Sequence, residues 1–149
     1  MSGILKIRIL TPEKEFYNGE IIELTSENEL GKFGILPNHV FMVTALKPSI
    51  TTFKTKDGKK LEAFISTGVL KVHNNEIEIL CDACEWPEDI DLSRAEEAKE
   101  RAVKTLKDKK LGDVRRAEIA MTRALLRIKV KKMWLKSIQN KNFVLYTFF

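Results

Sequence analysis

The stretch that decides the fold is residues 85–95, which read Glu-Trp-Pro-Glu-Asp-Ile-Asp-Leu-Ser-Arg-Ala. Before it, apolar residues recur at every second position, as in a strand with one buried face. After it they recur every three or four positions, as in an amphipathic helix. Pro87 ends the strand region because proline has no N–H for a ladder hydrogen bond, and Asp89 or Asp91 can cap the first helical turn. We therefore predict a domain boundary here, which is also a candidate site.

The part before this stretch has the pattern of a β-sandwich or barrel. Asn18-Gly19 and Asp57-Gly58 are typical turn sequences, and two glycines and a proline predict a shaped loop over residues 31–39. Between such breaks, short runs of alternating apolar residues predict strands at residues 4–10, 21–25, 42–46, 50–54, 60–66, 69–73 and 76–81. Many short strands at near-regular spacing favour a sandwich or barrel.

The part after the stretch predicts an antiparallel pair of helices. The first helix has an apolar stripe that stops at Leu111-Gly112, and Asp113 is the expected cap of the second helix. The stripes consist largely of alanine: Leu92, Ala95, Ala98, Ala102 and Leu106, then Ala117, Ala120, Met121, Ala124, Leu125 and Ile128. Alanine allows close approach but buries little area, so we expect a hairpin that is marginal alone and easily rearranged.

Charge is divided unevenly along the chain. Residues 1–85 carry 10 Lys and Arg against 12 Asp and Glu, whereas residues 86–149 carry 16 against 9. A basic helical half suggests an acidic partner, which could be nucleic acid, an anionic membrane, a phosphorylated ligand or an acidic protein surface. No apolar run approaches the roughly 20 residues of a membrane span, and the N-terminus lacks a signal-peptide core, so we expect a soluble, intracellular chain.

Cys81 and Cys84 form a single Cys-x-x-Cys, and the two histidines are His39 and His73. Zinc needs two more ligands than this pair supplies, and a redox pair usually has its first cysteine at a helix N-terminus. We therefore interpret both thiols as small core residues and expect no metal.

Five short motifs, in order and in register, resemble the ε subunit of the F-type ATP synthase, bacterial type. They are Ser26-x-x-Glu29-Leu30-Gly31, Gly34-Ile35-Leu36-Pro37-x-His39, Thr44-Ala45-Leu46-Lys47-Pro48, Leu80-x-Asp82 and Ile90-Asp91-x-x-Arg94-Ala95. The resemblance covers residues 1 to about 135. It implies a ten-stranded β-sandwich over residues 1–86 and a two-helix hairpin over residues 87–138.

The resemblance also implies a non-catalytic central-stalk subunit that couples rotation of the c ring to F1. The sandwich would bind the γ subunit and the c ring, and the protein would lie peripherally on the cytoplasmic face of the bacterial plasma membrane. The residues implied in the contact with the c ring and γ are Glu29, Gly31, Gly34, Leu36, Pro37 and His39. The alternative is that the glycines and Pro37 are ordinary turn residues and His39 is a satisfied loop histidine.

Some bacterial members of this family bind ATP through an Ile/Leu-Asp-x-x-Arg-Ala motif and arginines on both helices. Carried over residue by residue, Glu85, Ile90, Asp91 and Ala95 would contact adenine, and Arg94, Arg101, Arg123 and Arg127 would hold phosphate. Carboxylates accept hydrogen bonds from an amine, and guanidinium groups pair bidentately with phosphate. The alternative is a solvated charged face, since Glu97 precedes Arg101 by four residues, the favourable order for a helical ion pair.

With no P-loop and no catalytic constellation, ATP would be a regulatory ligand and not a substrate. Without ATP, the basic second helix could insert against acidic surfaces of the α and β subunits and impede hydrolysis; ATP would draw it back. A different class of function is a basic nucleic-acid-binding module, but the aromatic residues that could stack on bases lie outside the arginine cluster. The apolar tail over residues 139–149 has no assigned role.

Overall fold

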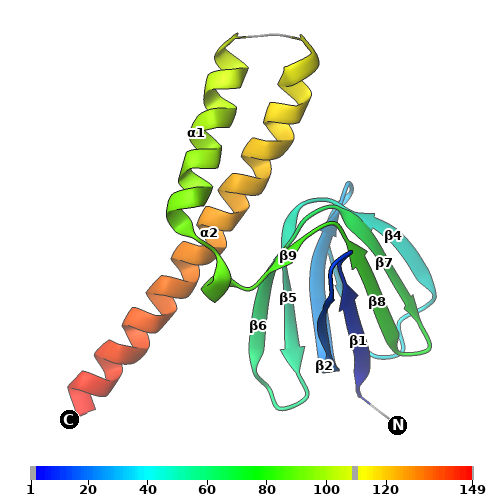
Figure 1. The fold of residues 1–149 in the computed structure, drawn as a ribbon. Helices are drawn as coiled ribbons and strands as arrows, with labels where there is room; N and C mark the ends of the chain where they lie inside the picture. Colours follow the sequence, from blue (N-terminus) through cyan, green and yellow to red (C-terminus); the bar gives the residue numbers. More distant parts are fainter. Residues whose placement is uncertain (1–2, 109–110, 149) are drawn as a thin grey trace. The chain divides into compact units, whose positions relative to one another are not determined.

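The computed structural model describes residues 3–108 and 111–148, and the chain divides into two compact units, Met1–Glu85 and Trp86–Phe149. The first unit is all β (Figure 1). Over the described residues it has nine strands: β1 (Leu5–Leu10), β2 (Glu15–Asn28), β3 (Gly31–Ile35), β4 (Met42–Leu46), β5 (Ser49–Thr55), β6 (Lys60–Ile65), β7 (Gly68–His73), β8 (Glu76–Cys81) and β9 (Cys84–Glu85). The predicted fold of a β-sandwich followed by two helices is confirmed, with nine strands rather than ten.

The strands pair in the order β4-β7-β8-β1-β2-β5-β6-β9, and β3 pairs with β2. All pairs are antiparallel except β1 with β8, which is parallel. The sheet curls over on itself, so that β5 and β6 lie across from β7 and β8 (Figure 1). Side chains from β1, β5, β6, β7 and β8 form much of the core: Leu5, Ile7, Ile9, Phe53, Phe64, Leu70, Val72, Ile77 and Ile79 are at most 2% exposed. The predicted strand period therefore places the core correctly.

The predicted Asn18-Gly19 turn is wrong. Both residues lie inside β2, where Asn18 pairs with Arg8 and Gly19 pairs with Ile7. The chain reverses earlier, and Thr11 closes that turn through N–H···O=C contacts with Lys14 at 3.0 Å. Gly19 leaves room for the Tyr17 side chain, because a Cβ there would lie 2.7 Å from the Tyr17 hydroxyl oxygen and the ring would have to shift. A turn-like dipeptide was therefore overruled by strand pairing.

The predicted loop over residues 31–39 is only partly right. Residues Gly31–Ile35 form β3, whose backbone pairs with β2 from Asn28 to Leu24. Gly31 has φ of 121°, which a side chain rarely tolerates, so this glycine permits the reversal from β2 into β3. The irregular part of the segment is confined to residues 36–41.

The second unit begins with a 3-10 turn, η1 (Pro87–Asp89), and continues as α1 (Leu92–Asp108) and α2 (Leu111–Phe148). The predicted stop at Leu111-Gly112 lies too far along the chain, since α1 ends at Asp108 and both residues belong to α2. Asp113 therefore lies in the first turn of α2 rather than capping it, where a carboxylate is favoured by the helix dipole. The helix also continues without a break through most of the predicted tail.

The two helices pack through what we call the alanine seam, which consists of Ala95, Ala102, Ala117 and Ala124. These four side chains are at most 5% exposed. In each helix the two seam alanines are seven residues apart, which is close to two turns and keeps them on one face. The predicted antiparallel hairpin with alanine at its contact is confirmed (Figure 1), but Ala120 and Leu125 of the predicted apolar stripe are exposed.

Candidate functional site

The motif at residues 90–95 forms the entrance to α1. Ile90 is 3% exposed, and its N–H donates to the Pro87 carbonyl at 3.2 Å. Asp91 caps α1, because the Arg94 N–H donates to Asp91 Oδ1 at 3.1 Å and the Ala95 N–H donates to the Asp91 carbonyl at 3.0 Å. One carboxylate oxygen is therefore used for capping, and the other can accept a ligand hydrogen bond.

An arginine directly precedes each seam alanine: Arg94, Arg101, Arg116 and Arg123. One residue is about 100° around a helix, so each of these arginines flanks the seam. Two antiparallel helices are related by a two-fold axis perpendicular to them, so positions one residue before the contact fall on the same side of both. Arg127, three residues after Ala124, falls on this side too. We call this side the arginine flank.

The register of the two helices shows which arginines share a level. Lys131 Nζ on α2 donates to the Glu88 carbonyl of η1 at 3.3 Å. Counting away from this contact along both chains places Ala95 opposite Ala124 and Ala102 opposite Ala117. Arg94 is then level with the turn that carries Arg123 and Arg127. Arg101 lies about 10 Å farther toward the connection between the helices, level with Arg116.

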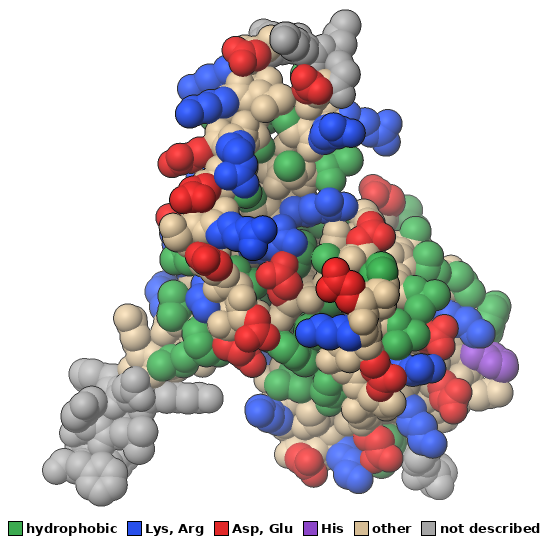
Figure 2. Space-filling model, in the orientation of Figure 1, with side chains coloured by type: hydrophobic (Ala, Val, Ile, Leu, Met, Phe, Trp, Pro, Cys, Tyr) green, Lys and Arg blue, Asp and Glu red, His purple; other side chains and the backbone are tan. Residues whose placement is uncertain are grey.

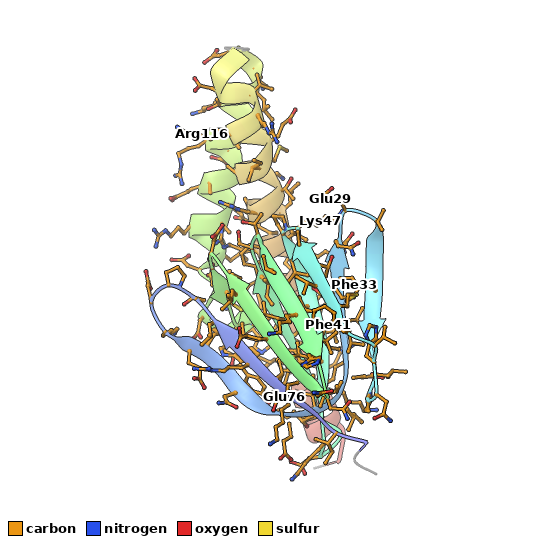
Figure 3. The ribbon with its side chains drawn as sticks, turned by 90° about the vertical axis from the view of Figure 1, so that its right-hand side faces the viewer. Glu29, Phe33, Phe41, Lys47, Glu76 and Arg116 are labelled. Carbon is orange, nitrogen blue, oxygen red and sulfur yellow. The ribbon has the colours of Figure 1, made fainter. Side chains whose placement is uncertain are left out.

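A hollow of about 470 Å³ lies along α2 and is lined by Arg115, Arg116, Ile119, Ala120 and Arg123. Arg123 is half-buried, and its Nε is a buried donor without a partner among the residues that the structure describes. Arg116 is exposed and extends sideways from the hairpin (Figure 3). The hollow thus has three arginines in its lining, one of which carries the unpartnered Nε, and such a set of donors could hold an anion.

Arg115 and Arg116 were not among the predicted ligand residues. The signal for Arg116 is present in the sequence, as the Arg-Ala pair that recurs seven residues later at Arg123-Ala124. The opposite side of the hairpin differs in charge. There a hollow of about 380 Å³ is lined by lysines and by Glu96 and Glu100, so carboxylates offset the positive charge.

The remaining predicted adenine contacts are less available on the described surface. Ala95 is buried in the alanine seam, where it packs α1 on α2. Glu85 belongs to β9 in the sandwich unit, and it pairs there with Phe64. Of the predicted ATP residues, Asp91, Arg94, Arg123 and Arg127 fall at a similar level of the hairpin by the register counted from Lys131 and Glu88.

The residues predicted for the c-ring and γ contact lie at two ends of β3. Glu29 is in the exposed turn before the strand, next to Leu30, which is 98% exposed. Leu36, Pro37 and His39 follow the strand, and five residues of strand separate the two ends by about 17 Å. Figure 3 shows Glu29 at one end, Phe33 on the strand and Phe41 toward the other end. Gly31 and Gly34 lie on β3 between these ends.

The far end of β3 is fixed by a reciprocal pair of asparagines. The Asn38 N–H donates to Asn75 Oδ1 at 2.6 Å, and Asn75 Nδ2 donates to Asn38 Oδ1 at 3.3 Å. His39 Nδ1 lies 2.7 Å from the carbonyl oxygen of the next residue, Val40. The rings of Phe41 and His73 pack edge to face, with their centroids 5.5 Å apart. This end is therefore an ordered surface rather than a loose loop.

An exposed apolar surface lies on the outer face of β4, β7 and β8, and sequence reasoning missed it. We call it the apolar face: Phe41, Val43, Ala45, Val69 and Leu80, all of them exposed. Ala45 pairs with Val69 and Val69 pairs with Leu80, so three of its members form one row across three strands. Green side chains gather along the β4–β7 edge in Figure 2. The signal was a strand, β4, that is apolar on both sides.

Cys81 and Cys84 are both buried and free. A hydrogen bond from the Cys84 thiol lowers the pKa of Cys81, while this bond and burial raise the pKa of Cys84. Cys81 Sγ also lies 3.6 Å from the Leu10 carbonyl oxygen. Within residues 3–108 and 111–148, no three His, Cys, Asp or Glu side chains gather as a metal site would require, and no helix is both long and apolar enough to cross a bilayer.

Two family models match nearly the whole chain. Residues 4–87 match the β-sandwich domain of the ATP synthase delta/epsilon chain, and residues 88–132 match its long α-helix domain. ATP synthase epsilon chains from Clostridium are similar over most of this chain. That of Clostridium kluyveri is 50% identical over 132 residues, which is 89% of this chain and 100% of the relative, and that of Clostridium novyi is 45% identical over 130 residues, 87% and 99% respectively.

Solved structures of low sequence identity share the fold. A chain of the Euglena gracilis mitochondrial ATP synthase, in a structure of OSCP, F1 and the c-ring, matches with a TM-score of 0.78 at 20% identity, covering 91% of this chain and 83% of that one. A chain of the Tetrahymena thermophila central stalk and c-ring matches with a TM-score of 0.62 at 17% identity, covering 85% and 96%.

Proposed function

The chain belongs to the ATP synthase delta/epsilon family, as an epsilon chain and hence a non-catalytic subunit of the central stalk, and on that premise we propose that its hairpin is an ATP-responsive regulator. The feature that supports the proposal is the arginine flank, because helical periodicity puts arginine positions of both helices on one side of the alanine seam. One polyanion on this flank can pair with α1 and α2 together. Its binding would hold the two helices in the closed arrangement.

Phosphate would bind Arg94, Arg123 and Arg127, which share a level, and Arg116 would extend the site along the hollow. The buried Nε of Arg123 supports this, because a buried donor without a partner is unfavourable until a ligand oxygen accepts from it. Asp91 Oδ2 would accept from the adenine amine beside them. Arg101 lies two turns from Arg94, within reach of the last phosphate of an extended chain and not of the base.

The regulatory step follows from the weakness of the seam. In the open hairpin, α2 would present a basic surface to acidic surfaces of the α and β subunits, and this contact would impede hydrolysis. ATP binds across both helices only when they are closed, so ATP shifts the population toward the closed state by its differential affinity. The ATP concentration would then determine how often the hairpin is open and inhibits ATP hydrolysis by the α and β subunits.

Calorimetric titration of the full chain with ATP tests the site. We expect Arg123→Ala and Arg127→Ala each to weaken ATP binding by about tenfold or more, because each removes a charged hydrogen-bond donor. Lys129→Ala is the matched control: it removes one positive charge from α2 on the side away from the arginine flank, and we expect less than a twofold change. If both arginine variants bind ATP as the parent does, the site is wrong.

For the sandwich, we propose that the apolar face docks on the γ subunit and that the Glu29 turn contacts the c ring, leaving the protein peripheral on the cytoplasmic face of the membrane. Exposed apolar side chains in a continuous row favour a protein partner. Val69→Asp should reduce retention of the chain on a γ-containing complex, measured by co-purification, while Lys71→Asp on the same strand and face should reduce it less. Equal retention of Val69→Asp and the parent would refute the apolar face.

A further inference from the structure

Helix α2 continues well beyond the part of the chain that matches the family. The match to the helical domain ends at residue 132, whereas α2 runs to Phe148. We call residues 133–148 the extension. Its first turn includes Met133 and Leu135, which are exposed, and Trp134, which is half-buried. The extension therefore adds an aromatic side chain directly after the matched region.

Trp134 contacts the residue that joins α2 to η1. The Lys131 ammonium lies 4.6 Å from the centroid of the Trp134 ring, within the range of a cation–π contact. The same ammonium donates to the Glu88 carbonyl at 3.3 Å. The two residues are three apart on one helix, so their side chains lie on the same face.

The Glu88 carbonyl is a favourable acceptor for this lysine. Within η1, the Asp89 N–H donates to the Trp86 carbonyl and the Ile90 N–H donates to the Pro87 carbonyl, so these turn bonds leave the Glu88 oxygen to Lys131. This hydrogen bond links η1 to α2. Since η1 leads directly into Ile90 and Asp91, the link lies next to the entrance to α1.

We propose that Lys131 and Trp134 form a clamp that holds η1 against α2 and so favours the closed hairpin without ATP. The bond to Glu88 joins elements that separate when the hairpin opens, whereas the contact between Lys131 and Trp134 lies within α2 and persists. The Trp134 ring therefore restricts the Lys131 side chain already in the open hairpin, to rotamers that can reach the Glu88 carbonyl. This lowers the entropy cost of forming the hydrogen bond when the hairpin closes. Trp134 and Lys131 are positioning residues and need not touch ATP.

The consequence for regulation rests on the proposed function. If ATP binds the closed hairpin, a clamp that raises the closed population raises the apparent affinity for ATP by the same factor. An epsilon chain that ends before residue 134 lacks this ring. The extension would then lower the ATP concentration at which the hairpin is mostly closed.

Hydrogen exchange of the α1 amides in the full chain, measured without ATP, tests the clamp. We expect Lys131→Met to speed exchange by about five- to tenfold, because it removes both the hydrogen bond and the cation–π contact. Trp134→Ala should speed it by about two- to fivefold. Lys131→Arg and Trp134→Phe preserve the charge and the ring and should recover most of the protection.

Two truncations separate the ring from the rest of the extension. Deleting residues 133–149 should speed α1 exchange as Trp134→Ala does, whereas deleting residues 141–149 leaves the clamp in place and should match the parent. The clamp is refuted if Lys131→Met exchanges as the parent does, or if both deletions have the same effect. An ATP titration of the parent stands apart: failure to bind would remove the proposed ATP function, while the exchange result would still decide the clamp.

Discussion

The core of the sandwich and the core of the hairpin consist of different kinds of side chain. Between the β layers, large aliphatic and aromatic residues such as Phe53, Phe64 and Ile9 are almost completely buried. Within the described residues of α1 and α2, the buried side chains are the four seam alanines and Val130, and no aromatic residue is among them. A buried Phe or Ile contributes about 1.5–3 kcal/mol, and an alanine methyl under about 1 kcal/mol. The β unit is thus suited to be a rigid platform, and the hairpin to be rearranged by modest contacts.

This difference in packing energy indicates which unit a ligand or a single contact can rearrange. In the sandwich, a single contact is a small part of a large total, so a ligand or a lysine cannot reorganise it. In the hairpin, the free-energy contribution of one charged hydrogen bond is comparable to that of one buried alanine of the seam. The arginine flank and the Lys131 clamp therefore act on the element with the smallest opposing energy.

The largest effect is expected from a cavity in the sandwich. Phe64→Ala should lower the free energy of unfolding by about 3–5 kcal/mol, because Phe64 is fully buried and the β layers cannot close around the space. Urea unfolding followed by tryptophan fluorescence and circular dichroism measures it. Ala102→Gly in the seam is the counterpart and should cost only about 1 kcal/mol. Similar losses in the two variants would contradict the contrast between the units.

A smaller effect is expected where the sandwich backbone is tightly packed. A Cβ at Gly68 would collide with the Leu80 carbonyl and lie 2.9 Å from Cys81 Cβ, so Gly68→Ala should cost about 1–3 kcal/mol. Gly34 is the matched control: its nearest neighbour would be the Leu24 carbonyl at 3.7 Å, an ordinary contact, so Gly34→Ala should be nearly neutral. Thermal unfolding of both variants decides whether crowding or the loss of glycine itself is responsible.

The part of the β unit that could be predicted from the sequence is the part determined by hydrophobic periodicity. Leu5, Ile7 and Ile9 alternate with charged residues, and they form the core of β1 as expected. The Asn18-Gly19 signal failed because turn propensity concerns neighbouring residues, whereas Asn18 and Gly19 pair with Arg8 and Ile7 on the preceding strand. The apolar face was missed because periodicity identifies the buried side of a strand and gives no expectation for an apolar exposed side.

The candidate site was readable in part. Residue types and spacing indicated Asp91, Arg94, Arg123 and Arg127, and their joint role in binding stays a prediction. They did not indicate that Ala95 is used for packing, nor that Glu29 and His39 lie at opposite ends of β3. The contact of Lys131 with Glu88 joins residues 43 apart, so no local pattern could have shown it.

The smallest effect sharpens the contrast at the entrance to the hairpin. Asp91→Ala removes the cap of α1 and should lower helix stability by about 1 kcal/mol, a loss visible as faster amide exchange in the first turn of α1 and absent from the sandwich amides. Asp89→Ala is the control, because Asp89 is an exposed acid two residues earlier that belongs to η1 and does not cap α1. Asp91→Asn restores an oxygen acceptor for the Arg94 N–H and should recover the protection. If Asp91→Asn recovers the cap but not ATP binding, the charge of the carboxylate serves the ligand and not the fold. If Asp91→Ala leaves both exchange and ATP binding unchanged, the entrance to α1 is held by the buried Ile90 and the clamp alone, and the motif has no role in either.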